Sequence, residues 1–109
     1  MSRFDEMAKD WDNDPVKINR AKSVGEAIRK NVNLTKDMSG LEFGCGTGLL
    51  SFNLQPYLKK ITLVDNSVGM MEVLQQKIEQ SGLDNMFPLC TDLLEEDLPA
   101  EKFDIIYTL

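Results

Sequence analysis

The sequence lacks several residue types that common catalytic sites need. Its 109 residues contain no histidine, one tryptophan and two cysteines. The absence of histidine excludes His-based acid/base catalysis and histidine metal sites, and two cysteines far apart in the chain do not make a zinc site. We therefore expect no metal centre.

Long apolar runs and an excess of basic residues are missing as well. No window approaches the roughly 18 apolar residues of a membrane-spanning helix, and the first residues do not resemble a signal peptide. The formal net charge of −6 argues against a nucleic-acid backbone as the main partner. Because two cysteines do not form a disulfide framework, we expect a protein of the reducing cytoplasm.

A chain of this length forms one domain at most. The first 40 residues of the sequence predict two helices. Asp14 and Pro15 suit the N-cap and first position of a longer helix that runs to about Asn31. A shorter amphipathic helix precedes it, with an apolar stripe formed by Phe4, Met7, Ala8 and Trp11. The apolar side of the longer helix is expected to be Ile18, Ala21, Val24, Ala27, Ile28 and Val32. We treat residues 1–40 as a helical cap on residues 41–109.

From residue 41 onward, short strands alternate with helices. Residues 41–43 are expected to end a first strand, and further strands are expected at 60–64, 86–90 and 103–108, with Pro88 making the third an edge strand. The first helix of this part is expected to run to about Gln55 and stop at Pro56, and the second begins after Ser67 and ends at Gly82. The predicted fold class is α/β, a doubly wound, parallel, Rossmann-like sheet with helices on both faces.

A glycine-rich turn joins the first of these strands to its helix. Residues 41–48 read LEFGCGTG, with glycine at three alternate positions. One glycine would suffice for a tight connection, which is the alternative interpretation. Three of them favour a turn where a ligand approaches main-chain N–H groups without a Cβ in the way.

Acidic residues follow the next two strands. Asp65 ends the second strand, 21 residues after Gly44, where a carboxylate can accept hydrogen bonds from two ribose hydroxyls. Its alternative role is to cap the next helix, which Ser67 already provides. Asp92 follows the third strand, where it could accept a hydrogen bond from an exocyclic amine such as that of adenine. Because the carboxyl ends of parallel strands meet at one edge, these features together predict a nucleoside site.

The pattern resembles that of the class I S-adenosylmethionine-dependent methyltransferases of the small-molecule type. Residues 41–48 match the first motif of that family at every signature position, with the spacing G-x-G-x-G instead of the dinucleotide fingerprint G-x-G-x-x-G. Residues 63–67 with Met70 look like the second motif, residues 90–93 like the next one, and residues 103–109 like the fourth strand. Residues 4–12 resemble a helical cap whose aromatic residue lies over the cofactor. The resemblance covers almost the whole chain.

The resemblance implies S-adenosyl-L-methionine as the cofactor, S-adenosyl-L-homocysteine as the product and a small-molecule methyl acceptor. The glycine loop would run past the methionine moiety, and Glu42 would orient that loop or meet the amino end through water. Asp65 would hold the ribose and Asp92 the adenine. The candidate cofactor-binding residues are Trp11, Glu42, Gly44, Cys45, Gly46, Asp65, Asn66, Met70, Asp92 and Leu93. No catalytic residue is assigned.

Some of these residues have a second interpretation. Trp11 would shield the site, or it would only pack its helix against the sheet edge. Cys45 suits a crowded turn because it is small, and we do not expect it to act as a nucleophile. Lys17 and Arg20 could face the carboxylate of the cofactor from the longer helix, although the sequence alone does not argue for this role.

The chain stops where the family continues into further strands and helices. By family topology the strand order would be 3-2-1-4, and we expect a fragment that holds the cofactor half of a methyltransferase without most of the acceptor site. The fourth strand would then have an exposed edge through which two copies could associate. Two other functions stay open: a non-catalytic nucleoside-binding or assembly domain and, disfavoured by the glycine spacing, an NAD-dependent oxidoreductase module.

Overall fold

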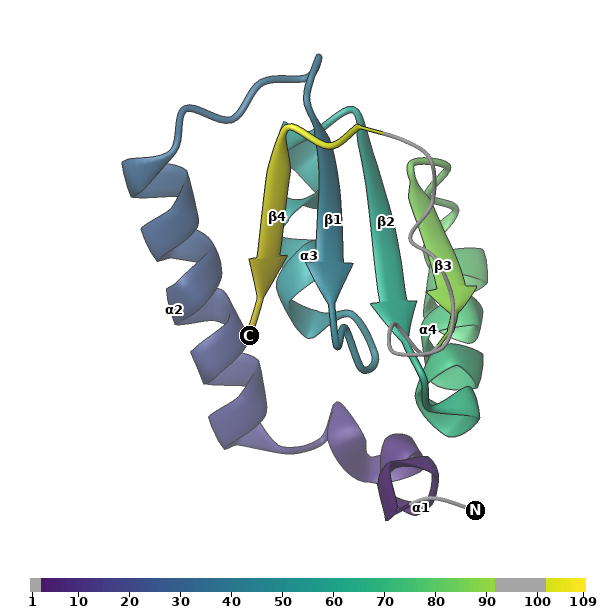
Figure 1. Cartoon of the computed structure of the whole chain (residues 1–109). Helices are drawn as coiled ribbons and strands as arrows, with labels where there is room; N and C mark the ends of the chain where they lie inside the picture. The colour runs from purple at the N-terminus through teal and green to yellow at the C-terminus, as the bar shows by residue number, and fades with distance from the viewer. Residues whose placement is uncertain (1–2, 92–101) are drawn as a thin grey trace.

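Four short strands form one parallel sheet (Figure 1). They are β1 (Ser39–Phe43), β2 (Lys60–Asp65), β3 (Met86–Cys90) and β4 (Ile105–Thr108), in the order β3-β2-β1-β4. The predicted α/β class and the predicted strand order are thus confirmed. The structure, a computed structural model, describes residues 3–91 and 102–109, without the side chains of residues 3–6. Asp92 and Leu93, two of the candidate site residues, lie outside the described residues.

The helices begin and end at the residues that cap them. The described helices are α1 (Arg3–Trp11), α2 (Pro15–Asn31), α3 (Leu49–Leu54) with the 3-10 turn η1 (Gln55–Tyr57), and α4 (Val68–Ser81). Asp14 Oδ1 accepts a hydrogen bond from the amide of Val16 at 2.9 Å, and Ser67 Oγ accepts one from Met70 at 3.2 Å. Gly82 ends α4 with φ +68°, in the left-handed region. None of these helices is long and apolar enough to cross a membrane.

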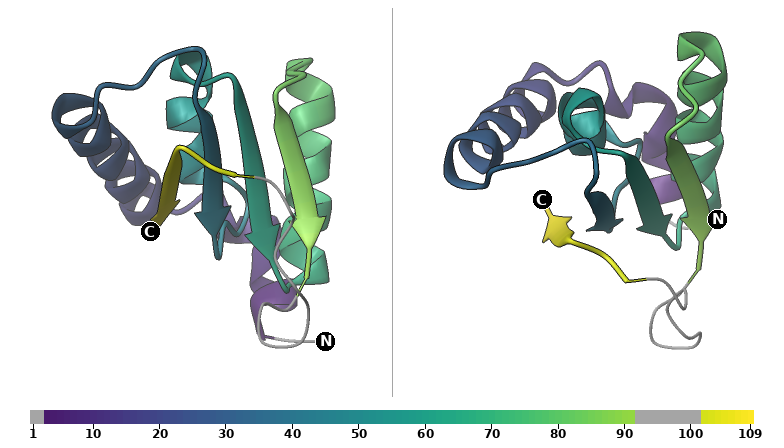
Figure 2. Two further views of the ribbon diagram at one scale, coloured as in Figure 1. Left: turned by 45° about the horizontal axis from the view of Figure 1, so that its top comes forward. Right: turned by 90° about the horizontal axis from the view of Figure 1, so that it is seen from above.

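The helices are arranged so that the carboxyl ends of the strands face the N-terminal segment. We expected helices on both faces of the sheet; α2, α3 and α4 all lie on one face (Figure 2). The short helix α1 lies beyond the carboxyl ends of the strands, next to α4 (Figure 1). The core lies between the sheet and these helices, where Leu50, Leu54, Ile61, Leu63 and Leu74 are fully buried.

The inward face of α2 agrees with the predicted one only in part. Ala21 is buried, and Val24 and Ile28 pack against the core, as expected. Ile18, Ala27 and Val32 are exposed, and the second buried residue of the helix is Gly25. A Cβ added to Gly25 would lie 3.0 Å from the Cβ of Asn53 in α3. The missing side chain lets the two helices approach closely, and a pattern that counts only apolar side chains does not recognise glycine as an inward position.

Several element boundaries are set by contacts between strands. β1 begins at Ser39, which pairs in register with Lys60, and ends at Phe43 as predicted. The amide of Ser39 also donates to Asp104 Oδ2 at 2.7 Å, and the amide of Asp104 donates to the carbonyl of Ser39 at 2.8 Å. These two bonds fix the entry into β4, which begins at Ile105 instead of residue 103. Pro56 lies in the 3-10 turn that follows α3.

Candidate functional site

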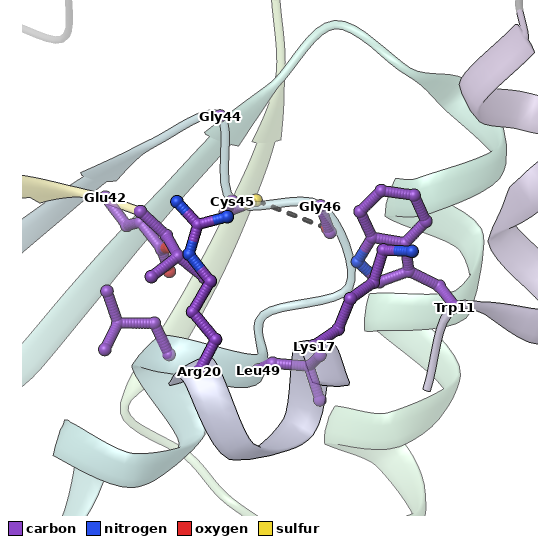
Figure 3. A pocket seen from close by; sticks show the side chains of 10 residues that line it. Trp11, Lys17, Arg20, Glu42, Gly44, Cys45, Gly46 and Leu49 are labelled. Carbon is purple, nitrogen blue, oxygen red and sulfur yellow. Dashed lines mark hydrogen bonds between the residues drawn. The ribbon is translucent and has the colours of Figure 1, made fainter. Parts of the chain in front are cut away.

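A pocket of about 230 Å³ lies between the glycine loop, residues 44–48, and the two N-terminal helices (Figure 3). Five of the predicted site residues line it, and α2 contributes two cations. The lining residues are Trp11, Lys17, Arg20, Glu42, Gly44, Cys45, Gly46, Leu49, Leu50 and Leu109. Residues of the N-terminal helices and of the glycine loop therefore line the same pocket.

The glycine loop has the left-handed backbone that its composition predicts. Gly44, Gly46 and Gly48 have φ values of +59°, +56° and +84°, a region that L side chains rarely adopt. A Cβ on Gly46 would lie 3.6 Å from Trp11 Nε1, so the indole lies directly beside the loop. The structure thus brings together Trp11 and the loop that it was predicted to shield.

Asp65 connects the carboxyl end of β2 to the glycine loop. Its Oδ2 accepts a hydrogen bond from the amide of Gly46 at 2.8 Å, and its Oδ1 accepts one from the amide of Ser67 at 2.9 Å. Each carboxylate oxygen is fixed by one N–H group and keeps a second lone pair as an acceptor. This link to the loop was not predicted, because residues 46 and 65 are brought together only by the pairing of β1 with β2.

The two candidates that follow Asp65 have different surroundings. Asn66 is exposed. Met70 is buried in the first turn of α4, and its Sδ lies 3.8 Å from the position that a Cβ on Gly46 would occupy. Met70 therefore supports the glycine loop from the side of α4, whereas Asn66 can meet a ligand directly.

Glu42 forms part of the floor of the pocket and is only 1% exposed. The hydroxyl of Ser51 lies 2.5 Å from Glu42 Oε1, to which it donates, and 2.8 Å from the hydroxyl of Tyr107. Burial raises the pKa of Glu42 from 4.5 to about 7, although the hydrogen bond from Ser51 opposes this rise; the charge of Asp65 adds to it. Sequence reasoning missed Ser51 and Tyr107, since nothing in their spacing relates them to position 42.

Cys45 is enclosed by the core. Its Sγ lies 3.9 Å from Met71 Sδ, and its side chain belongs to the buried cluster between the sheet and the helices. Burial, followed by the negative charge of Glu42, raises the pKa of the thiol, so that it stays protonated at neutral pH. This environment agrees with a small residue in a crowded turn and not with a nucleophile.

Two cations from α2 line the pocket, and they differ in their partners. Lys17 forms an ion pair with Asp14 Oδ2 at 3.0 Å, and its Nζ lies 4.1 Å from the centre of the Trp11 ring. Arg20 reaches toward the glycine loop (Figure 3) and has no ion-pair partner among the described side chains, those of residues 7–91 and 102–109. Its charge is therefore available to an anionic group of a ligand. In that same part of the chain, no three His, Cys, Asp or Glu side chains are grouped as metal ligands.

Comparisons with known proteins agree with this geometry. A family model described as a methyltransferase domain matches residues 41–109. The solved structure of a putative S-adenosyl-L-methionine-dependent methyltransferase from Methanococcus maripaludis has a TM-score of 0.82 at 20% identity; the match covers 99% of this chain and 51% of that chain. This likeness supports the fold.

Two curated methyltransferases of different kinds are similar to this chain. The ubiquinone biosynthesis O-methyltransferase of Coxiella burnetii is 30% identical over 109 residues, which cover 97% of this chain and 46% of the relative. Protein arginine N-methyltransferase 1 of Saccharomyces cerevisiae is 37% identical over 89 residues, which cover 80% of this chain and 25% of the relative. The chain thus spans less than half the length of these relatives.

Proposed function

The chain belongs to the methyltransferase-domain family of the S-adenosylmethionine-dependent methyltransferases, and from this premise we propose that its pocket binds S-adenosyl-L-methionine for methyl transfer. One observation carries the proposal. The glycine loop, an Arg20 side chain without a described ion-pair partner and the Glu42 carboxylate surround a single pocket. These are the groups that an amino-acid end with one carboxylate and one ammonium requires.

We propose that the nucleoside end of the cofactor, its ribose and adenine, binds to residues outside this pocket. Asp65 keeps two acceptor positions, one on each oxygen, which suits the two hydroxyls of a ribose. Gly44 and Gly46 have no Cβ, so a ligand can approach the loop closely. We propose that Asn66 flanks the adenine and that Asp92 and Leu93, outside the described residues, bind its edge.

The residues of this chain bind and orient, and the cofactor carries the chemistry. When bound, S-adenosyl-L-methionine supplies a methyl group made electrophilic by its sulfonium, and S-adenosyl-L-homocysteine is the product. Arg20 would hold the carboxylate and Asp65 the ribose, which fixes the orientation that transfer requires. Trp11 and Lys17 would cover the loop side of the pocket and exclude water. The acceptor we propose is a small molecule, since the relative named for ubiquinone biosynthesis matches over nearly the whole chain.

Parallel calorimetric titrations with S-adenosyl-L-methionine, S-adenosyl-L-homocysteine and NAD test the proposal. We expect the first two ligands to bind and NAD not to bind. Asp65→Ala should weaken the binding of S-adenosyl-L-homocysteine by about 1–3 kcal/mol, because a charged hydrogen-bond acceptor is lost. Asp84→Ala is the matched control, since Asp84 is an exposed carboxylate in the turn after α4.

Two results would contradict the proposal. Binding of NAD alone would favour the oxidoreductase module, and unchanged affinity in a folded Asp65→Ala variant would remove Asp65 from the site. Binding of S-adenosyl-L-homocysteine without methyl transfer to any acceptor tested would support a chain that holds the cofactor half without most of the acceptor site.

We also propose that two copies associate through the edge of β4. This strand is the last of the sheet beside β1, and Ile106 is 58% exposed on it. An apolar edge strand offers unpaired backbone groups to another strand, and a lysine on such an edge opposes pairing. Ile106→Lys should therefore shift the protein toward monomer in sedimentation velocity at high concentration. Phe87→Lys, on the opposite edge strand β3, is the control; equal sedimentation of the wild type and both variants would contradict the proposal.

A cytoplasmic location is proposed on the basis of the cysteines. No disulfide joins Cys45, which lies in the glycine loop, to Cys90 at the end of β3. Reduced thiols are the rule in the cytoplasm.

A further inference from the structure

A network of charged and polar contacts links the N-terminal helices to the glycine loop and to α4. The hydroxyl of Thr47 donates a hydrogen bond to Asp12 Oδ1. Lys77 Nζ forms an ion pair with Asp12 Oδ2 at 2.8 Å and donates to the carbonyl oxygen of Thr47, also at 2.8 Å. We call Asp12, Thr47 and Lys77 the clasp; each of its members contacts the other two.

The clasp lies next to the pocket but outside it. None of its three residues lines the pocket, whereas the residues directly before Asp12 and Thr47 do: Trp11 and Gly46. A bond between positions 12 and 47 therefore holds the indole against the loop, where Trp11 Nε1 lies 3.6 Å from the Cβ position of Gly46.

The surroundings of the clasp make it stronger than an ordinary surface ion pair. Exposed pairs contribute little because water screens them and two long side chains must be ordered. Here Thr47 is fully buried, and the side chains of Lys77 and Asp12 are only 24% and 31% exposed. Lys77 Nζ also lies 4.6 Å from the centre of the Phe52 ring, which restricts its side chain further.

We propose that the clasp holds the N-terminal cap closed over the pocket and thereby sets the affinity of the site for its ligand. Asp12, Thr47 and Lys77 act as positioning residues, because they touch the loop and the cap but not the pocket. Opening the clasp frees the segment that carries Trp11, and a ligand then binds only the fraction of molecules whose cap is closed. The choice of S-adenosyl-L-homocysteine as the ligand in the test rests on the proposed function, whereas the closed position of the cap is independent of it.

The only tryptophan of the chain is Trp11, so its fluorescence reports the cap without a label and without a ligand. We expect Lys77→Met and Thr47→Val to increase the acrylamide quenching of Trp11 at a temperature where all variants are folded. Lys77→Arg and Thr47→Ser, which keep the charge and the hydroxyl, should restore most of the protection. Lys22→Met is the matched control, because Lys22 is an exposed lysine of α2 and the net charge changes equally.

Calorimetry with S-adenosyl-L-homocysteine measures the consequence for the pocket. We expect the Kd to rise about fivefold to tenfold in Lys77→Met and in Thr47→Val, because the closed fraction falls, and to stay unchanged in Lys22→Met. A double-mutant cycle between Asp12→Asn and Lys77→Met should show that the two losses are not additive.

The outcomes separate this inference from the proposed function. Trp11 quenching that is unchanged in both clasp variants overturns the clasp, even if their melting temperatures fall, since a merely structural contact would lower stability alone. Increased quenching with an unchanged Kd would show that the clasp does not set the affinity of the pocket for its ligand. Increased quenching in a protein whose wild type binds no S-adenosyl-L-homocysteine supports the closed cap and contradicts the proposed cofactor.

Discussion

Gly48→Ala is expected to lower the free energy of unfolding by about 3 kcal/mol, from two additive causes. The φ of +84° at this position disfavours any residue with a Cβ. In addition, the new Cβ would lie 2.8 Å from Leu74 Cδ1 and 3.3 Å from Leu63 Cδ2. Both leucines are fully buried, so neither side chain can move away without disturbing the core.

Gly82→Ala separates the two causes. Gly82 has φ +68° after α4, and a Cβ there would meet no atom within 4 Å. The free energy of unfolding of Gly82→Ala should therefore fall by only about 1 kcal/mol, the cost of the left-handed backbone. Urea unfolding of the wild type and both variants measures the difference. Equal losses in the two variants would mean that the core around Leu74 yields to the added methyl group, contrary to our expectation.

Glu42→Gln should stabilise the protein at pH 8 and have little effect at pH 5. The pKa of Glu42 is raised from 4.5 to about 7 in the folded state. The folded protein therefore holds a proton that the unfolded chain releases between these values, so wild-type stability falls as the pH rises from 4.5 to 7 and then levels off. The difference between these two pKa values corresponds to about 3 kcal/mol in the free energy of unfolding. Glutamine keeps an acceptor for Ser51 but carries no charge to bury.

Denaturant unfolding at pH 5, 6, 7 and 8 measures this effect. Glu79→Gln is the matched control, because Glu79 is exposed on α4 and its substitution removes the same charge. The stability difference between the two variants should widen from pH 5 to pH 7. Parallel curves would show that the Glu42 carboxylate is charged in the folded protein at pH 5.

Most of the fold could be predicted from the sequence because its signals are local. The N-caps Asp14 and Ser67 and the stop at Gly82 mark helix ends through contacts within a few residues. The strand order followed from the family resemblance. The inward face of α2 was predicted only in part, because the close approach at Gly25 depends on Asn53 in another helix, which no local pattern contains.

The site was predictable in its glycine loop and not in the side chains that support it. The left-handed backbone of Gly44 and Gly46 was predicted from their composition and spacing, and Asp65 lies at the expected end of a strand; their role in binding a cofactor stays a prediction. The hydroxyl of Ser51 in α3 contacts both Glu42 in β1 and Tyr107 in β4, and the Asp12–Lys77 ion pair joins residues 65 positions apart. Such pairs depend on tertiary packing, which one sequence does not reveal.

The pairing of β1 with β4 has a consequence for the order in which the protein assembles. Ser39 and Asp104, which join the beginnings of these strands, are 65 residues apart, whereas β1 and β2 are separated by one short helix. Closing the longer loop costs more chain entropy, and such non-local contacts form slowly. We expect β1, β2 and β3 to associate before β4 docks. Tyr107 would then reach Ser51 in the last step, so that the surroundings of Glu42 are completed only when folding ends.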